Sequence, residues 1–277
     1  MKLLIIGATS YIGSRLVFDL QGENDVVGTY HSNNTISQNF IHVDIRDKDS
    51  IEKLIAGVNP EVVVHLANYS SSRQIKGNEI DFPKLNLDAT SNVVEALNKY
   101  EKPLIFFSSM AATTKQDLYG ELKAKSEEIV KTVKKGFAIV RPSAVIGLSP
   151  VQSHNKITDK ILSVINGQTQ EFDNSWILQP TYIGHLSQVI EQIVLMGIWN
   201  EEFNIFTDYP VTQYQIATDI LQQFDLKANP IDTGRVVPLA KIDDQKMKLF
   251  KLSPTSYKEI IDRIVSELKN PLLFQIK

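Results

Sequence analysis

The chain has 277 residues, a net charge of −3 and 43% hydrophobic residues, values that are ordinary for a globular protein with a large core. A charge balance this close to neutral argues against nucleic acid and anionic membranes as partners, because both attract basic surfaces. The sequence contains no cysteine, which excludes disulfides and thiol catalysis and suits the cytoplasm, and its apolar runs are too short for a signal peptide core or a membrane span.

The first thirteen residues predict a strand, a glycine turn and the start of a helix. Leu3 to Ile6 form a continuous apolar run, typical of a strand buried on both faces of a parallel sheet. Gly7 ends this run, and apolar residues follow at helical spacing from 11 to 20. A helix N-terminus behind a glycine turn suits a pyrophosphate, because free amide groups and the positive dipole end face the anion. The spacing Gly7-x-x-Ser10-x-x-Gly13 therefore indicates dinucleotide binding, with the Ser10 side chain expected to crowd the phosphates slightly.

The second expected strand, 25–30, ends without the acidic residue that usually holds the ribose of NAD. His31, Ser32 and Asn33 follow instead, and they can hydrogen-bond a 2′-phosphate that no carboxylate repels. The first Lys or Arg beyond them is Arg46. This segment therefore favours NADP(H), with NAD(H) as the alternative and an ordinary polar loop as the competing interpretation.

Strands and helices alternate up to Gly147, which predicts an α/β fold with a doubly wound parallel sheet of Rossmann type. The later strands are expected at 40–43, 61–66, 103–107 and 137–140, and the helices at 47–59, 86–100 and 119–133. His65 lies inside a strand and is expected to be a packed core histidine. The alternation then stops, with helices expected at 157–165, 184–196, 212–224 and 256–268 and a strand at 203–206. We therefore expect a cofactor domain over 1–147, to which the chain returns at 181–206, and a smaller C-terminal substrate-binding lobe formed by 148–180 and 207–277.

Tyr119 and Lys123 lie four positions apart, on one face of an expected helix, and Ser109 follows the fifth strand. An ammonium beside a phenol favours the phenolate, so Lys123 is expected to lower the pKa of Tyr119 towards neutrality. Such a tyrosine can exchange a proton with an alcohol or a carbonyl oxygen, which Ser109 can polarise. The set suits hydride transfer between a nicotinamide and a carbonyl carbon.

Together these motifs resemble the extended short-chain dehydrogenase/reductases, the NAD-dependent epimerase/dehydratase superfamily, and most of all its nucleotide-sugar 4-ketoreductases typified by dTDP-4-dehydrorhamnose reductase. The resemblance implies that Ser109, Tyr119 and Lys123 form the catalytic triad. It also implies that the cofactor is bound by Gly7, Thr9, Ser10, Tyr11, Ile12, Gly13, His31, Ser32, Asp44, Ile45, Leu66, Ala67, Asn68, Asn86, Ser108, Tyr119, Lys123, Pro142, Ser143 and Val145. The chain departs from the family pattern at Ser10 and in the gap of only ten positions between Ser109 and Tyr119.

The resemblance further implies a nucleotide-sugar substrate and a homodimer. Candidate substrate residues are Tyr69, Arg73, Ser109, Gln152, His154, Asn155, Lys156, Trp176 and Gln179. The leading hypothesis is an NAD(P)H-dependent reductase of a nucleoside-diphosphate 4-keto-6-deoxy sugar in deoxysugar biosynthesis, with hydride added at C4 and Tyr119 as the proton donor. The alternatives are an NAD-dependent nucleotide-sugar epimerase and a non-catalytic NADP-binding sensor. Residues 110–116 hold no acidic residue, which counts against a dehydratase, and the five histidines suggest no metal site.

Overall fold

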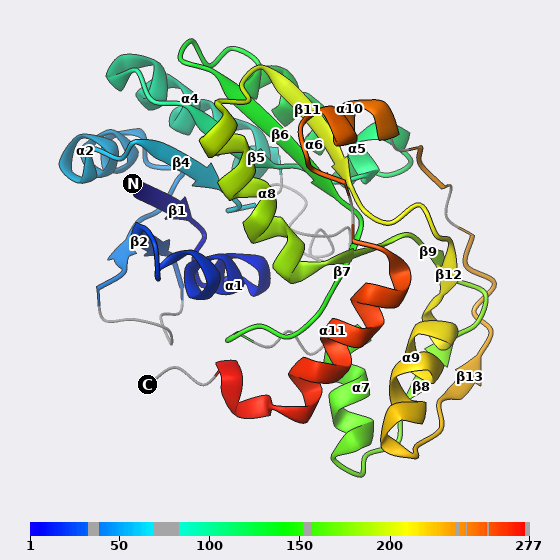
Figure 1. Cartoon of the computed structure of the whole chain (residues 1–277). Helices are drawn as coiled ribbons and strands as arrows, with labels where there is room; N and C mark the ends of the chain where they lie inside the picture. The colour runs from blue at the N-terminus through cyan, green and yellow to red at the C-terminus, as the bar shows by residue number, and fades with distance from the viewer. Residues whose placement is uncertain are drawn as a thin grey trace.

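The structure, a computed structural model, describes residues 1–32, 39–68, 83–151, 157–236, 239–241, 243–253 and 255–274. Its centre is a seven-stranded sheet in which every neighbouring pair is parallel (Figure 1). The strands are β1 (Lys2–Ile6), β2 (Asp25–Tyr30), β3 (Ile41–His42), β4 (Val62–His65), β5 (Leu104–Phe107), β6 (Phe137–Pro142) and β11 (Glu201–Ile205). Their spatial order is β11-β6-β5-β4-β1-β2-β3. The predicted doubly wound α/β fold is confirmed.

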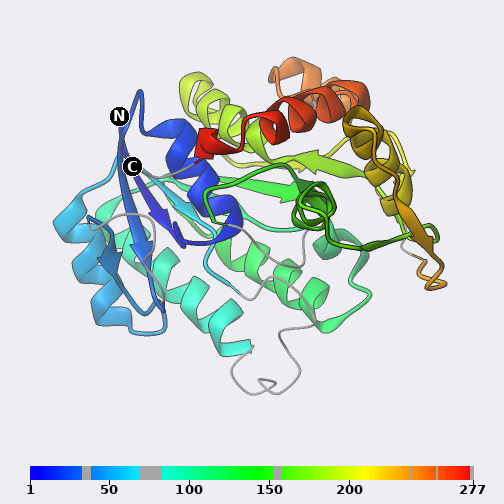
Figure 2. The ribbon, with the colours of Figure 1, turned by 90° about the horizontal axis from the view of Figure 1, so that it is seen from below.

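Two layers of helices cover the sheet (Figure 2). On one face lie α1 (Tyr11–Leu20), α8 (Ile183–Met196) and α11 (Tyr257–Lys269), and on the other lie α2 (Lys48–Val58), α4 (Ala89–Tyr100) and α6 (Leu118–Val130). Alternate residues of β1 point to opposite layers: Leu3 and Ile5 join the apolar cluster of the first face, whereas Leu4 and Ile6 join that of the second. This is why the strand is apolar without interruption.

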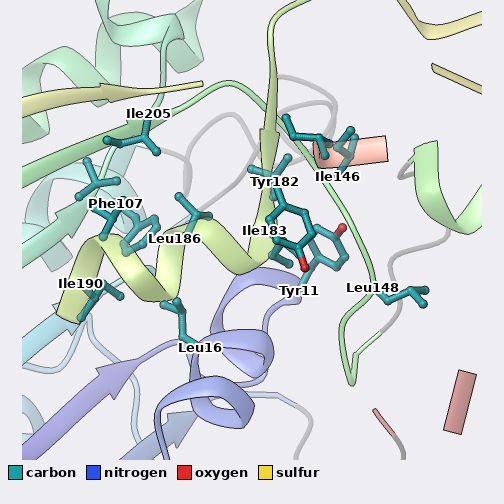
Figure 3. Close-up of a cluster of buried hydrophobic side chains, with 14 of the residues drawn as sticks. Tyr11, Leu16, Phe107, Ile146, Leu148, Tyr182, Ile183, Leu186, Ile190 and Ile205 are labelled. Carbon is teal, nitrogen blue, oxygen red and sulfur yellow. The ribbon is translucent and has the colours of Figure 1, made fainter. Parts of the chain in front are cut away.

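The first cluster continues beyond the sheet into the C-terminal part of the chain. In Figure 3, Leu16 of α1 and Leu186 and Ile190 of α8 belong to the same cluster as Phe107 of β5. Residues of α7 (Ile157–Ile165) and α9 (Gln213–Leu221) extend it. Three two-stranded sheets lie in this part: β7 (Ala144–Ile146) with β10 (Pro180–Tyr182), β9 (Ile177–Leu178) with β12 (Val211–Thr212), and β8 (Glu171–Asp173) with β13 (Asn229–Ile231).

Apart from β3, which was expected at 40–43, the short elements were not predicted from the sequence. Strands of two or three residues are too short to show a periodicity, and the same holds for α5 (Ala111–Thr114) and α10 (Asp244–Leu249). The helix expected to start at Asn86 begins instead with a π-helical turn, η2 (Lys84–Asp88). Short 3₁₀ turns follow α9 as η3 (Gln222–Phe224) and α11 as η4 (Pro271–Phe274). Within the described ranges no helix is long and apolar enough to cross a membrane.

The topology determines where a ligand can approach. β1 pairs with β2 on one side and with β4 on the other, so the strand order reverses at β1 and β4. In open parallel sheets a crevice forms at the carboxyl ends of the strands at this reversal. The glycine turn follows β1, and Leu66 to Asn68 follow β4, so both border that crevice.

Candidate active site

The glycine turn brings the chain too close to itself for side chains. A Cβ atom on Gly13 would lie 2.2 Å from the carbonyl oxygen of Gly7, and one on Gly7 would lie 3.0 Å from the amide nitrogen of Ala67. Gly7 also has φ +93°, in the region that favours glycine. The turn therefore places the start of α1 directly at the crevice, with room for the backbone to approach a pyrophosphate. These residues fit a dinucleotide cofactor.

Ser10 caps α1. Its hydroxyl donates to the Gly7 carbonyl at 2.8 Å and accepts from the Gly13 amide at 3.0 Å. The hydroxyl is thus directed into the turn, which stabilises the helix start. The predicted crowding at this position is better described as capping, since both hydrogen bonds lie within the turn itself.

The neighbours of Ser10 differ in exposure. Thr9 and Ile12 are partly buried, but the ring of Tyr11 is buried and its hydroxyl donates to the Gly147 carbonyl at 2.5 Å. Burial raises the pKa of Tyr11. The Tyr11 side chain therefore joins the turn to the segment after β7, and only its backbone is placed to serve a ligand at the turn.

The ends of β2 and β3 form a charged group. His31 is exposed, its Nδ1 lies 2.9 Å from the Ser32 hydroxyl, and its Nε2 lies 3.6 Å from the Asp44 carboxylate. Arg46 holds the same carboxylate through Nε at 3.0 Å and Nη2 at 2.8 Å. Hydrogen bonds from Arg46 lower the pKa of Asp44 to about 2. Tertiary structure thus brings the Arg46 cation to the end of β2, although no Lys or Arg follows that strand closely in the sequence. Ile45, between Asp44 and Arg46, is buried.

The end of β4 closes the other side of the crevice. The Leu66 amide donates to the Ile6 carbonyl at 2.9 Å, which continues the pairing of β4 with β1. Ala67 lies against Gly7, and the side-chain amide of Asn68 donates to the Leu66 carbonyl at 2.9 Å. All three predicted residues therefore line the strand ends that face the glycine turn.

Ser109, Tyr119 and Lys123 come together at the carboxyl end of β5. The Asp117 carboxylate caps α6 by accepting from the Gly120 amide at 2.8 Å, so Tyr119 lies in the first helical turn. The short gap after Ser109 is filled by α5, which packs so closely on α6 that a Cβ atom on Gly120 would lie 2.5 Å from the Ala111 carbonyl oxygen. This packing makes a gap of ten residues sufficient to bring Tyr119 to Ser109.

The pKa of Tyr119 differs from the prediction. Burial raises it to about 12, and a hydrogen bond with Ser109 acts in the opposite direction. Lys123 is not among the groups that shift it, and the Lys123 ammonium donates to the Phe107 carbonyl at 2.7 Å. The prediction that Lys123 lowers the pKa of Tyr119 is therefore wrong for this structure, in which burial dominates.

Lys123 is itself strongly perturbed. It is only 1% exposed, and burial lowers its pKa to about 7. Its ammonium lies 4.7 Å from the centre of the Phe106 ring, which provides a favourable cation–π contact. A lysine with a pKa near 7 exists in both protonation states at neutral pH.

His65 lies behind Lys123 and is fully buried, as predicted. Neither ring nitrogen has a hydrogen-bond partner among the described residues, and the ring packs 5.6 Å from that of Phe106. Burial, followed by the charge of Lys123, lowers the pKa of His65 to about 3. His65 is therefore a neutral core residue.

The remaining predicted cofactor residues adjoin this centre. Asn86 is buried in the π-helical turn, where its carbonyl accepts from the hydroxyls of Thr90 and Ser126. The Ser143 amide donates to the Thr181 hydroxyl at 3.0 Å. Pro142 ends β6, and Val145 is buried in β7. The strand end that is expected to pass the nicotinamide is thus held by β10.

Of the residues predicted to bind the substrate beyond Ser109, the structure describes Trp176 and Gln179. The Arg235 guanidinium lies over the Trp176 ring at 3.7 Å from its centre, so an arginine occupies one face of the indole. Gln179 is buried and its amide exchanges two hydrogen bonds with the backbone of Ala240. The predicted residues Asn33, Tyr69, Arg73, Gln152, His154, Asn155 and Lys156 lie outside the described residues.

A charged pair at the site, buried Glu127 and partly buried Arg141, was not predicted from the sequence. Glu127 lies on α6, one turn beyond Lys123, and pairs with Arg141 of β6. The available signal was Glu127 at the fourth position after Lys123, on the same helix face. An acidic residue at such a spacing more often lies on an exposed face, which is why it gave no prediction.

Comparison with known proteins identifies the family to which the chain is similar. The model of the NAD dependent epimerase/dehydratase family matches residues 3–191. The UDP-glucose 4-epimerase of Mycoplasma genitalium is 30% identical over 145 residues, which cover 47% of this chain and 41% of that protein. The chain therefore matches about two fifths of the length of this relative.

Two solved structures share the fold over nearly their whole length. The UDP-glucose 4-epimerase of Thermus thermophilus, in complex with NAD, has a TM-score of 0.81 at 18% identity and covers 98% of this chain and 99% of its own. The dTDP-4-dehydrorhamnose reductase of Bacillus anthracis str. Ames, in complex with NADP, has a TM-score of 0.80 at 17% identity and covers 96% and 99%. At these identities the likeness establishes the fold.

Proposed function

Because the chain belongs to the NAD dependent epimerase/dehydratase family, we propose that it is a nucleotide-sugar 4-epimerase, which inverts C4 of a nucleoside-diphosphate hexose. The observation that carries this proposal is that Ser109, directly after β5, lies close enough to Tyr119 in the first turn of α6 to lower its pKa, while Lys123, one turn further along α6, donates to the Phe107 carbonyl of β5. The names of the Mycoplasma and Thermus proteins, both UDP-glucose 4-epimerases, support epimerisation rather than net reduction.

Each residue has a distinct part in such a reaction. Bound NAD(P) supplies a reversible hydride acceptor at the sugar carbon. Tyr119 takes the proton of the sugar hydroxyl as the carbonyl forms and returns it when the alcohol forms again. Ser109 holds the same oxygen by a hydrogen bond, and Lys123, one helical turn away, is proposed to hold the ribose of the bound cofactor. Ser109 and Tyr119 are partly buried and Lys123 is buried, which strengthens these electrostatic effects.

A second candidate is a 4-ketoreductase, and one observation favours it. With its pKa raised to about 12, Tyr119 carries its proton at neutral pH and is ready to donate it to a carbonyl oxygen. The Bacillus anthracis neighbour is named as a reductase of this kind. The two candidates use the same residues. In the epimerase the hydride is taken from the sugar and returned to it, whereas in the reductase the hydride comes from NADPH or NADH and stays on the sugar.

The cofactor is NAD or NADP, as in the family and the neighbours. We propose a preference for NADP because Arg46 lies at the end of β2 as a permanent cation; the Asp44 carboxylate paired with it corrects the expectation that no carboxylate faces a 2′-phosphate there. A 2′-phosphate there meets a donor set that includes a permanent cation. Residues 148–180 and 207–277 are proposed to form the lobe that binds the sugar nucleotide, with Trp176 on its surface.

The experiment that tests the function compares two substrates. Purified protein is incubated with UDP-glucose and NAD, and UDP-galactose is measured by chromatography while nicotinamide absorbance is followed. In parallel, dTDP-4-keto-6-deoxyglucose is supplied with NADPH or NADH. UDP-galactose without net change in absorbance supports the epimerase. Stoichiometric NADPH consumption with the keto sugar replaces it by the reductase. Cofactor binding without either product contradicts both candidates.

A further inference from the structure

Glu127 is a buried carboxylate outside the predicted site. It is 4% exposed, although it lies on α6 among charged residues such as Lys125 and Glu128. Burial of a carboxylate is unfavourable unless donors replace the water it loses. Glu127 obtains those donors from two neighbouring strands of the sheet.

From β6, Arg141 donates through Nε to one carboxylate oxygen at 2.7 Å and through Nη2 to the other at 2.6 Å. From the position directly after β5, the buried hydroxyl of Ser108 donates to the first of these oxygens. Arg141 is also paired with Glu202 of β11, at the more exposed edge of the group. One carboxylate therefore joins α6, β5 and β6.

Each contact of Glu127 lies beside a residue of the proposed site. Ser108 precedes Ser109, Arg141 precedes Pro142, and Glu127 itself lies one helical turn beyond Lys123. The three elements that Glu127 joins are thus the ones that carry the proposed proton donor, the proposed carbonyl contact and the strand end expected at the nicotinamide.

We infer that Glu127 is the positioning residue of this site: its carboxylate fixes α6 against the ends of β5 and β6, so that Lys123 is held beneath Ser109 and Tyr119. The part of this inference that concerns turnover rests on the proposed function. Its effect on Lys123 is independent of any substrate, since all the contacts lie within the chain.

The charge of Glu127 has a second consequence for Lys123. The charged and titratable groups that act on that ammonium are Glu127 on its own helix, His65 on β4 and, beyond Glu127, Arg141 on β6, while Tyr119 lies one turn earlier on the same helix. Tyr119 and His65 are uncharged at neutral pH, with pKa values of about 12 and about 3. Burial lowers the pKa of Lys123, and the Glu127 carboxylate is the charge that acts against this. Loss of that carboxylate removes part of the protonated fraction of Lys123.

The test follows Lys123 directly in the folded protein. Lysine labelled with ¹³C at Cε is titrated by NMR, and the Lys123 signal is identified by its absence in Lys123→Met. In Glu127→Gln, which keeps the shape of the side chain, the titration midpoint is expected to fall by about one pH unit or more, because a charge one helical turn away is removed. Glu202→Gln is the matched control, since Glu202 also binds Arg141 but does not contact Ser108.

The outcomes separate positioning from a general loss of stability. A midpoint that is unchanged in Glu127→Gln, or that moves equally in Glu202→Gln, overturns the inference. If Glu127→Gln is too unstable to titrate, the double variant Glu127→Gln/Arg141→Met removes the unpaired guanidinium, and a smaller fall in midpoint is expected there, because loss of the Arg141 cation acts in the opposite direction.

Steady-state kinetics of the same variants then distinguish a failure of this inference from a failure of the proposed function. If the wild type is an epimerase or reductase, Glu127→Gln lowers kcat tenfold or more, with KM nearly unchanged and the upper limb of the pH profile moved to lower pH. If the wild type shows no turnover but the midpoint moves, the proposed function fails and the placement of Lys123 by Glu127 stands. A kcat in Glu127→Gln equal to that of Glu202→Gln contradicts the catalytic part.

Discussion

The guanidinium of Arg15, in the helix that follows the glycine turn, lies 2.8 Å from the carboxylate of Glu267 in α11. Both groups are buried, and Glu267 also accepts from the Tyr182 hydroxyl at 2.6 Å and the Leu148 amide at 2.9 Å. Residues at opposite ends of the chain therefore meet beneath the turn. The C-terminal helix holds α1, and with it the proposed pyrophosphate site.

Glu267→Gln is expected to lower the free energy of unfolding by about 2 kcal/mol or more, because the buried Arg15 charge loses one of its two carboxylate partners and keeps Asp19. Urea unfolding monitored by circular dichroism measures this. Glu259→Gln is the control: Glu259 pairs with Arg263 on the exposed face of the same helix, and its loss is expected to cost less than about 0.5 kcal/mol. Equal losses in the two variants would contradict the role given to burial.

Tyr119→Phe is expected to lower turnover by about a hundredfold or more, since the ring remains but no proton can be transferred. Cofactor affinity, measured by nicotinamide fluorescence, is expected to change little. Tyr100→Phe serves as the control, because Tyr100 ends α4 and belongs to neither the proposed active site nor the proposed substrate-binding lobe. Full activity in Tyr119→Phe would assign the proton transfer to another residue.

Lys123 makes the stability of the fold depend on pH. Its pKa is about 7 in the folded chain, below the ordinary value of about 10.4 expected when the chain unfolds. Between these values the unfolded chain binds more protons, so unfolding free energy is expected to rise with pH, by up to about 1.4 kcal/mol per unit. The difference between wild type and Lys123→Met, measured by urea unfolding at several pH values, isolates this slope. A constant difference across that range would show that Lys123 titrates normally.

Arg46→Gln is expected to weaken NADPH binding about tenfold, the loss of one charge-assisted contact, and to leave NADH binding nearly unchanged. Fluorescence titration with both cofactors measures the ratio. Lys48→Gln is a suitable control, because Lys48 is exposed and pairs with Glu95 away from His31. If both variants alter the two affinities alike, the proposed NADP preference of this group does not hold.

Ser10→Ala and Ser10→Gly test the cap of α1. Ser10→Ala removes the acceptor for the Gly13 amide and is expected to cost about 1 kcal/mol, whereas Ser10→Gly is expected to cost only a few tenths. Thermal unfolding compares them. Cofactor affinity is expected to change little in either variant, since the hydroxyl points into the turn. A large gain in affinity for Ser10→Gly would instead show that the serine crowds the phosphates.

Local patterns were enough to predict the sheet and the glycine turn. The apolar run of β1, the glycines that follow it and the alternation with helices report directly on strands buried between two layers. The spacing of Tyr119 and Lys123 likewise places both on one helix face, whatever surrounds them. Such signals are contained within a few consecutive residues, which is why α1, α2, α7 and α8 lie within about a residue of where they were expected.

Tertiary structure decided which charges meet and how deeply they are buried. The sequence does not show that Glu127 binds Arg141 and Ser108, that Glu267 binds Arg15, or that Arg46 lies beside His31, because each contact depends on how distant segments pack. It also predicted the pKa shift of Tyr119 in the wrong direction. Spacing along a helix places an ammonium near a phenol, but the cost of burying charge depends on the whole surrounding fold, and here that cost is the larger effect.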